Sequence, residues 1–158
     1  DVYINYYHKE NTNKAKLTGF ELQFAIQLKS NISLIGRMFY TFGEDITNQS
    51  PMRRIPPMNG FAAIKWNKNK QFWLNLEYQF ASRQDSLSNG DIDDDRIAPG
   101  GTPAWNVFNI TTGSQINKWV RINAGLNNIF DEAYRTHGSG VDAYGRYLWI
   151  SLNLGKYL

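Results

Sequence analysis

The sequence contains no cysteine, so it can form neither a disulfide framework nor a thiolate metal site. No run of about eighteen consecutive apolar residues occurs, which excludes a transmembrane helix. The formal net charge is only +3, and the basic residues lack the clustering of a phosphate-binding surface, so nucleic acid is not an expected partner. The chain opens on Asp1-Val2-Tyr3-Ile4 without the segments of a signal peptide, which suits a mature protein or a piece of a longer one.

Motifs of catalysis are also missing. The sequence has no glycine-rich phosphate loop, no paired carboxylates and no recognisable Ser–His–Asp arrangement. Gly138-Ser139-Gly140 is too short for a nucleophile elbow and has no strand–turn–helix context. We therefore expect neither an enzymatic activity nor a cofactor.

Aromatic residues are abundant for so polar a chain. Phe, Trp and Tyr make up 15% of the residues, whereas the mean hydropathy is −0.50. A soluble domain could hold these rings in its core. A transmembrane barrel would hold them in girdles at the two membrane interfaces, and its polar lumen would lower the mean hydropathy. Composition alone does not separate the two.

Alternation of apolar and polar residues with a period of two runs through most of the chain, and this period is typical of β-strands. In the clearest segment, one face carries Phe72, Leu74, Leu76, Tyr78 and Phe80. The other face of that segment carries Trp73, Asn75, Glu77 and Gln79. No window shows convincing helical periodicity, so the sequence predicts an all-β, antiparallel fold.

About eight strands are expected from this pattern. They are Val2–Tyr7, Gly19–Leu28, Ile32–Phe42, Gly60–Trp66, Phe72–Phe80, Ala104–Ile116, Val120–Asn127 and Leu148–Gly155. Most are long enough for the 9–11 residues or so that a tilted strand needs to cross a bilayer. The segment 32–42 has apolar residues on both faces, so its two faces cannot be assigned from the sequence.

The connections between these strands alternate in length. Short ones are expected at 29–31, 67–70 and 117–118, and long ones at 8–16, 43–59, 82–103 and 128–145. The short connections hold lysines and no acids. The long ones hold eleven of the 14 acidic residues, namely Glu10, Glu44, Asp45, Asp85, Asp91, Asp93, Asp94, Asp95, Asp131, Glu132 and Asp142. Outer-membrane barrels have short periplasmic turns and long extracellular loops, whereas a Greek-key sandwich has no reason to alternate so regularly.

Several motifs together resemble the C-terminal part of TonB-dependent outer-membrane receptors. The motifs are Gly19-Phe20-Glu21, Arg54–Gly60 with its Ile-Pro-Pro, Thr102-Pro103-Ala104-Trp105, Val120–Leu126, Asn128-Ile129-Phe130-Asp131-Glu132-Ala133-Tyr134 and Gly145-Arg146. Ile129 stands where the family usually has Leu, and Tyr144 replaces the proline before Gly145. The family usually ends on Phe, whereas this chain ends on Leu158.

The resemblance implies that residues 1–158 are the C-terminal strands of a larger barrel of about 22 strands, without the N-terminal plug domain. It implies a receptor in the bacterial outer membrane that takes up a nutrient such as a metal chelate, a cofactor or a sugar. The expected partners are TonB (through the missing plug region), the barrel-assembly machinery, outer-membrane lipid, the nutrient ligand and a surface lipoprotein. The stripe 72–80 would then place its apolar face toward lipid and Asn75, Glu77 and Gln79 toward the lumen.

Two other functions stay open at this point. Eight strands can close into a small complete barrel with a structural or adhesive role. A soluble β-rich binding domain is the other alternative, and the detergent dependence of solubility would separate it from both barrels.

The candidate site residues lie mostly in the long connections. Asp91, Asp93 and Asp95 place carboxylates at alternate positions, as a calcium loop does, although Gly100 stands where an EF-hand has Glu. His137 in a glycine-rich loop is a further candidate metal ligand. Trp105, Arg135 and His137 are candidates for ligand contact. For all of these, the structural alternative is a solvated loop.

The closing strand is the candidate assembly signal that the resemblance implies. Its alternating apolar residues are Leu148, Ile150, Leu152, Leu154 and Leu158. The alternative is that this row only contacts lipid, like the other strands.

Among the tryptophans, Trp73, Trp105, Trp119 and Trp149 could stack on a ligand, although Trp119 suits an interfacial girdle better.

Overall fold

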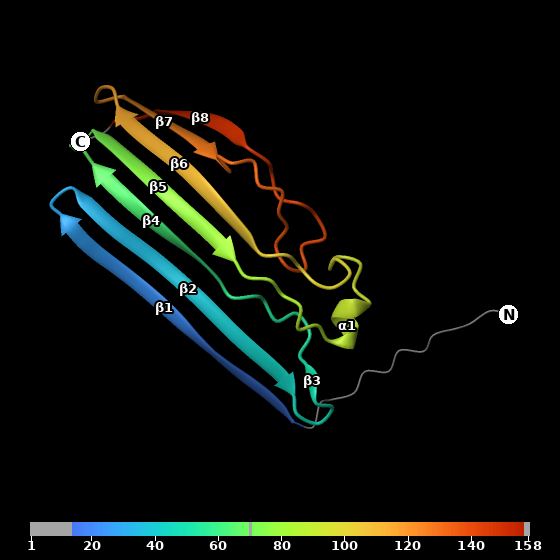
Figure 1. Ribbon diagram of the computed structural model, residues 1–158. Coiled ribbons are helices and arrows are strands. Elements are labelled where there is room, and N and C mark those ends of the chain that lie inside the picture. Colours follow the sequence, from blue (N-terminus) through green and yellow to red (C-terminus); the bar gives the residue numbers. More distant parts are fainter. Residues whose placement is uncertain (1–13, 70, 157–158) are drawn as a thin grey trace.

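The computed structural model describes residues 14–69 and 71–156, which form one antiparallel sheet with a single helical turn (Figure 1). Its elements are β1 (Ala15–Lys29), β2 (Ile32–Asp45), β3 (Ser50–Pro51), β4 (Asn59–Asn67), β5 (Phe72–Ala81), α1 (Asn89–Ile92), β6 (Trp105–Gln115), β7 (Val120–Asn127) and β8 (Tyr147–Leu154). The order in the sheet is β1-β2-β4-β5-β6-β7-β8, and β3 pairs with β2. Each long strand therefore pairs with its neighbours along the chain, and the all-β, antiparallel prediction is confirmed.

Seven of the expected strands correspond to the seven long strands of the sheet, and the eighth, Val2–Tyr7, lies outside the described residues. The first hairpin is longer than the sequence predicts, because backbone pairing continues to Ala15↔Asp45. Lys16, Glu44 and Asp45 were therefore wrongly assigned to long connections, since all three lie in strands. The short strand β3 is an addition inside the expected connection 43–59.

Asparagine side chains hold two of the three short connections. The Oδ1 of Asn69 accepts hydrogen bonds from the backbone N of Gln71 (2.9 Å) and Phe72 (2.8 Å). The Oδ1 of Asn117 does the same for Trp119 (2.7 Å) and Val120 (3.1 Å). These are Asx-type turns, which Asn favours because its short side chain reaches donors two and three residues ahead.

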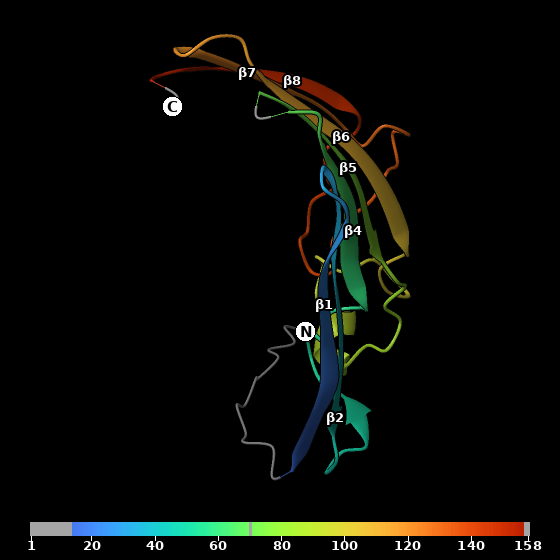
Figure 2. The same cartoon turned by 90° about the vertical axis from the view of Figure 1, so that its left-hand side faces the viewer.

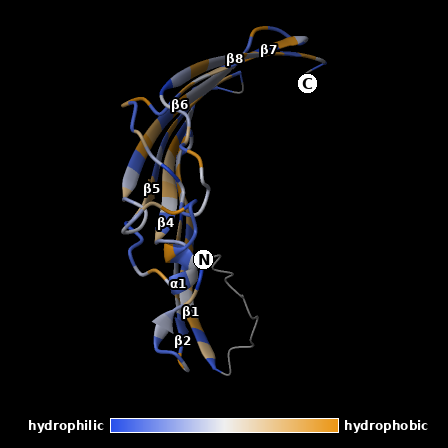
Figure 3. Ribbon diagram, turned by 90° about the vertical axis from the view of Figure 1, so that its right-hand side faces the viewer, coloured by the Kyte–Doolittle hydropathy of each residue, from blue (hydrophilic) through white to orange (hydrophobic). Residues whose placement is uncertain are grey.

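Strand register builds one continuous apolar face across the sheet. Leu76 of β5 pairs with Ile64 of β4 and Ile110 of β6, and Ile110 pairs with Leu126 of β7. The alternation of apolar and polar residues is visible along the strands in Figure 3. Large apolar side chains on this face stay exposed, including Leu76 (42%) and Ile150 (71%). Exposing so large an apolar surface, which extends over seven strands, to water is energetically unfavourable, so this face requires an apolar environment.

The same register resolves the two faces of β2, which the sequence leaves ambiguous. Leu34 pairs with Ile26 of β1 and Ile64 of β4, which places it on the apolar face with Met38 and Tyr40. Ile35 and Phe39 lie on the opposite face with the polar residues. The buried strand residues other than glycine, within the described part, all lie on that polar face: Ala63, Ala81, Val107 and Asn109.

Aromatic residues border the apolar face at both ends. Tyr78, Phe80 and Phe108 cluster near the long connections, with ring centroids 4.8 to 5.7 Å apart. Trp66 and Phe72, 6.1 Å apart, lie near the short connections. From position 72 to position 80, β5 rises about 27 Å, or about 20 Å after the usual strand tilt, which approaches the apolar band of about 25 Å in membrane barrels.

The sheet curves into an arc and does not close (Figure 2). Among the described residues, β1 and β8 are its two edges and do not pair with each other. No helix in this part of the chain is long and apolar enough to cross a membrane.

Candidate functional site

The long connections gather at one end of the sheet (Figure 1). They border a cavity of about 650 Å³ there. Four strands and the connections 46–58 and 128–146 contribute to its wall. Its lining includes the side chains of Arg37, Phe61, Glu77, Gln79, Trp105 and His137. Aromatic rings and a few polar groups thus face one space, which is the usual composition of a binding site.

The polar groups in the cavity wall are already held in place by the sheet. The Oε1 of Glu77 accepts hydrogen bonds from Gln79 Nε2 (2.6 Å) and Asn109 Nδ2 (3.2 Å). Arg37 donates to Gln23 Oε1 (3.1 Å), and its guanidinium carbon lies 5.3 Å from the ring centroid of Phe39. Because these groups are fixed before any ligand arrives, binding would cost little side-chain ordering.

Trp105 and His137, two of the residues that the sequence suggests for ligand contact, line the same cavity. Trp105 packs against Tyr134, with ring centroids 4.6 Å apart. A second cavity of about 280 Å³ is lined by both Trp105 and Arg135. The structure therefore brings all three candidate contact residues together around Trp105.

The side chains of Arg135 and His137 are each anchored within the connections. Arg135 Nε donates to Asp142 Oδ1 (2.8 Å), and His137 Nδ1 lies 2.8 Å from Thr102 Oγ1. Burial lowers the pKa of His137, while the charges of Asp91 and Asp94 act in the opposite direction. The net pKa is below its ordinary value, so the imidazole is neutral at pH 7.

Residues 89–95, the expected calcium loop, begin with the helical turn α1, which the sequence pattern did not predict. Ser88 caps this turn, and Asp91 completes a capping box with it. Asp91 is only 2% exposed, and its carboxylate accepts hydrogen bonds from Ser88 N (3.1 Å), Ser88 Oγ (2.9 Å) and Arg54 N (3.0 Å). A turn of four residues is too short to show helical periodicity, but the Ser-x-x-Asp pattern was a visible signal.

Asp93 and Asp95 are exposed, whereas Asp91 is buried. Within residues 14–69 and 71–156, no group of three or more His, Cys, Asp or Glu side chains could hold a metal ion. A metal role for Asp91, Asp93, Asp95 and His137 therefore stays a prediction from the sequence.

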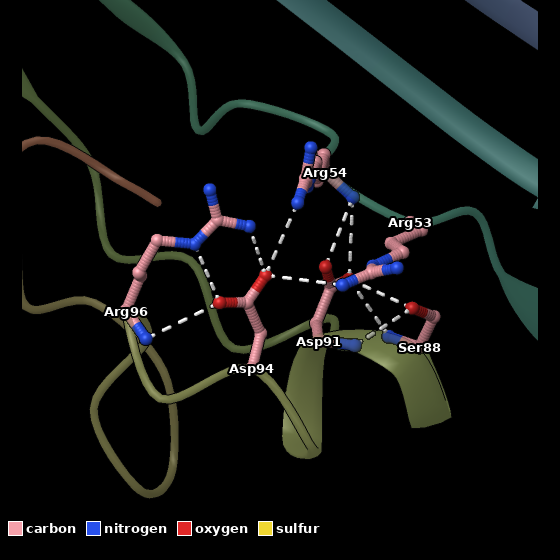
Figure 4. A network of polar contacts seen from close by, with 6 residues as sticks. All are labelled: Arg53, Arg54, Ser88, Asp91, Asp94 and Arg96. Carbon is pink, nitrogen blue, oxygen red and sulfur yellow. Dashed lines mark hydrogen bonds and ion pairs between the residues drawn. The ribbon is translucent and has the colours of Figure 1, made fainter. Parts of the chain in front are cut away.

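A buried carboxylate joins two of the long connections (Figure 4). Asp94 Oδ2 contacts Arg53 Nη2 (3.1 Å) and Arg54 Nη2 (3.4 Å) from the connection 46–58, and Arg96 Nη2 (2.6 Å) from its own connection. Hydrogen bonds from Arg96 lower the pKa of Asp94 far below its ordinary value, although burial acts to raise it. Gln84 Nε2 adds a hydrogen bond to Ile55 O (2.7 Å) between the same two connections.

Substitution Asp94→Asn should loosen the connection 82–104 from the connection 46–58. A carboxylate with a depressed pKa stabilises the fold above its ordinary pKa, and loses this contribution only as the pH falls through the lowered value. The native contact should therefore persist at pH 4, and the variant should lack it at pH 7. Faster amide hydrogen exchange in residues 84–103 would show the loss.

Asp85→Asn is the matched control, because Asp85 forms an ion pair with Arg83 in which both side chains are more than half exposed. Exposed pairs contribute little, so this variant should exchange like the native protein. Equal exchange in the Asp94 variant and in native protein would contradict a joining role for Asp94.

Asn128 closes the connection between β7 and β8. It is 2% exposed and has a positive φ of 49°. Its Nδ2 donates to Glu132 O (2.9 Å) and Tyr144 O (3.1 Å), and its Oδ1 accepts from Glu132 N (2.9 Å). The motif 128–134 thus acts by bridging the two ends of a long loop, beyond the local turn that its sequence suggests.

The other tryptophans have structural surroundings. Trp73 covers Gly113 of β6, where an added Cβ would lie 2.4 Å from the indole nitrogen. Trp149 covers Gly125 in the same way, and its Nε1 donates to Asn127 Oδ1 (2.9 Å). Trp119 lies at the opposite end of the sheet and is 51% exposed. Only Trp105, of the four tryptophans considered, therefore lines the cavity.

The wall residues Arg37 and Phe61 were not singled out from the sequence. Their signal is positional, because they pair with each other on the polar face, near the start of β4 that follows the long connection 46–58. Which of several polar positions borders the cavity depends on register across neighbouring strands.

Comparison with known proteins agrees with this geometry. The family model for "TonB dependent receptor-like, beta-barrel" matches residues 2–129. No curated protein sequence matches the chain. The solved structures of similar fold include "Copper transporter OprC", with a TM-score of 0.75 at 17% identity over 89% of this chain and 23% of that one.

Two further receptors show the same likeness. The ferric-catecholate import receptor Fiu from E. coli K12 has a TM-score of 0.67 at 15% identity, covering 90% of this chain and 21% of Fiu. The siderophore receptor PiuA from Acinetobacter baumannii has a TM-score of 0.67 at 15% identity, covering 89% of this chain and 22% of PiuA. At these identities the likeness establishes the fold alone, and the chain spans less than a quarter of each neighbour.

The described sheet is a wall segment of a membrane β-barrel, with one apolar face, one polar face and long connections at one end. The chain belongs to the TonB-dependent receptor-like β-barrel family, whose members are bacterial outer-membrane receptors and transporters, not enzymes.

Proposed function

We propose that this chain forms the last strands of an outer-membrane receptor that takes up a nutrient under the control of TonB. The observation that carries the proposal is the cavity at the loop end of the polar face, lined by Trp105 and His137. In a barrel, the polar face lines the lumen and the long connections face outside. The cavity would then open toward both the external medium and the transport path.

The lining of the cavity suits a ligand with flat or apolar surfaces and a few polar groups. Phe61 and Trp105 offer ring faces, and Gln79 offers amide groups beside Glu77. The neutral imidazole of His137 adds either a donor or an acceptor, since Thr102 can take the complementary role. The neighbouring structures include receptors for copper and for siderophores, and we propose a metal chelate ahead of a cofactor or a sugar.

The test is uptake by cells that carry the complete reading frame of this chain, with a ferric catecholate and copper(II) chloride as separate probes. For the transported probe, Trp105→Ala with His137→Ala should raise the half-saturation concentration about tenfold or more, the usual cost of losing a central aromatic contact. Trp119→Ala, at the far end of the sheet, is the matched control and should leave it unchanged. An unchanged value in the double variant would refute the cavity as the binding site.

The remaining partners follow from the same proposal. TonB would act through a plug region outside residues 1–158, and a surface lipoprotein could cover the long connections. Lipid would contact the apolar face, and the barrel-assembly machinery would bind β8. Leu148, Ile150, Leu152 and Leu154 form the exposed apolar row of β8, which is also a sheet edge in the described part, whereas Leu158 lies outside that part.

A further inference from the structure

The short connections carry a set of lysines that the proposed function does not use. This set, the turn lysines, consists of Lys29 at the end of β1, Lys68 between β4 and β5, Lys118 between β6 and β7, and Lys156 after β8. All four residues are exposed. Although they come from distant parts of the sequence, the antiparallel order brings them to one end of the sheet.

No negative charge of the described chain balances the turn lysines. The ion pairs among described residues involve arginine only, at positions 37, 53, 54, 83, 96 and 135. The described short connections contain no Asp or Glu, and neither do the strand ends that flank them. Most of the acids lie at the opposite end, in the long connections. Among the described residues, this end of the sheet therefore carries charged side chains of one sign only.

The turn lysines lie at the level where the apolar face ends. Lys118 Nζ lies 5.6 Å from the ring centroid of Trp119, which is half exposed beside the first residues of β7. Trp66 and Phe72 mark the same border on β4 and β5. Aromatic rings at the border of a membrane barrel sit at the depth of the lipid headgroups. An ammonium group within reach of Trp119 is then at that depth too.

We propose that the turn lysines bind anionic glycerophospholipid headgroups in the leaflet that meets the short connections. Lysine suits this role because its long apolar stem can follow the sheet border while the ammonium reaches the phosphate. The inference rests on the proposed membrane location, but it adds a lipid selectivity that a barrel wall does not require. The partner is a lipid rather than an acidic protein because the cations border an apolar face.

The experiment measures tryptophan quenching in the complete protein, reconstituted in phosphatidylcholine vesicles that contain brominated phosphatidylglycerol or brominated phosphatidylcholine. The Trp119 contribution is isolated by subtracting the signal of Trp119→Phe. Brominated phosphatidylglycerol should quench Trp119 at a lower mole fraction than its zwitterionic counterpart, and high salt should weaken this preference. Each lysine should account for about a fivefold difference in lipid affinity.

Triple substitution Lys68→Gln, Lys118→Gln and Lys156→Gln should remove the preference. The matched control is Lys14→Gln with Lys16→Gln, which removes exposed lysines from the opposite end of the sheet and should retain it. Equal quenching by both lipids in the native protein, or a preference that survives the triple substitution, would overturn the inference. Protection of the turn lysines from acetylation by an acidic peptide, without lipid preference, would assign the surface to a protein. If neither lipid quenches any tryptophan, the membrane location itself fails.

Discussion

Replacing Leu76 by arginine should lower the free energy of unfolding from a bilayer by about 2–4 kcal/mol. Leu76 lies at the middle of β5, and its partners on both sides, Ile64 and Ile110, are apolar too. An arginine there would place its guanidinium in the hydrocarbon core, several residues from either aromatic border. Denaturant titration of the complete protein refolded into lipid vesicles measures the change.

Thr111→Arg is the control that the strand register provides. Thr111 follows Ile110 on β6, so it has the same depth as Leu76 but lies on the polar face. From the sequence alone, Gln79 on the polar face of β5 would be the control position. Gln79 is less suitable, because it donates a hydrogen bond to Glu77 and lines the cavity. The Thr111 variant should lose little stability. Similar losses for both variants would reverse or abolish the assignment of the two faces.

Asn128→Ala should destabilise the connection 128–146 by about 2–4 kcal/mol. The variant loses three side-chain hydrogen bonds to Glu132 and Tyr144, each contributing about 1 kcal/mol. It also places alanine at a φ of 49°, a conformation that costs an L-residue roughly a further 1 kcal/mol and that Asn tolerates better. Tryptic cleavage after Arg135 should accelerate about thirtyfold or more, because cleavage follows the population of the open loop.

Asn117→Ala is the matched control, because it removes an asparagine that caps a turn but does not bridge the two ends of a loop. Asn117 also accepts two backbone hydrogen bonds, but it lies in an exposed turn where water can replace it. Cleavage after Arg135 should not change in that variant. If Asn128→Ala left cleavage as slow as Asn117→Ala does, the loop would be held by other contacts.

Strands with one apolar face were predictable, because alternation in segments such as 72–80 is a local property. The assignment of β2 was not, since Ile35 and Phe39 are as apolar as Leu34 and Met38. Pairing of β2 with β1 and β4 assigns its two faces, and this pairing cannot be predicted from the sequence of β2 alone. The ends of the first hairpin were missed for a similar reason, because Lys16 and Glu44 gain strand structure from each other's backbone.

The candidate site was predictable as a region but not as a set of contacts. The sequence places Arg135 and His137 in a long connection and Trp105 near the start of a strand that follows another one, and the structure brings the three residues together. The partners of Asp94 come from residues about forty positions earlier in the chain. No periodicity or motif in the sequence predicts a contact between residues so far apart in the chain. The contact forms because the folded strands bring the two connections together.

Three connections hold one another at the loop end through specific side chains. Asp94 joins 82–104 to 46–58, and His137 with Thr102 joins 128–146 to 82–104. An insertion in one connection would displace contacts in the other two, so evolutionary change in ligand preference would have to involve all three. For protein engineering, the exchangeable unit is accordingly the whole set of connections with the strand ends that carry it, and not an individual loop.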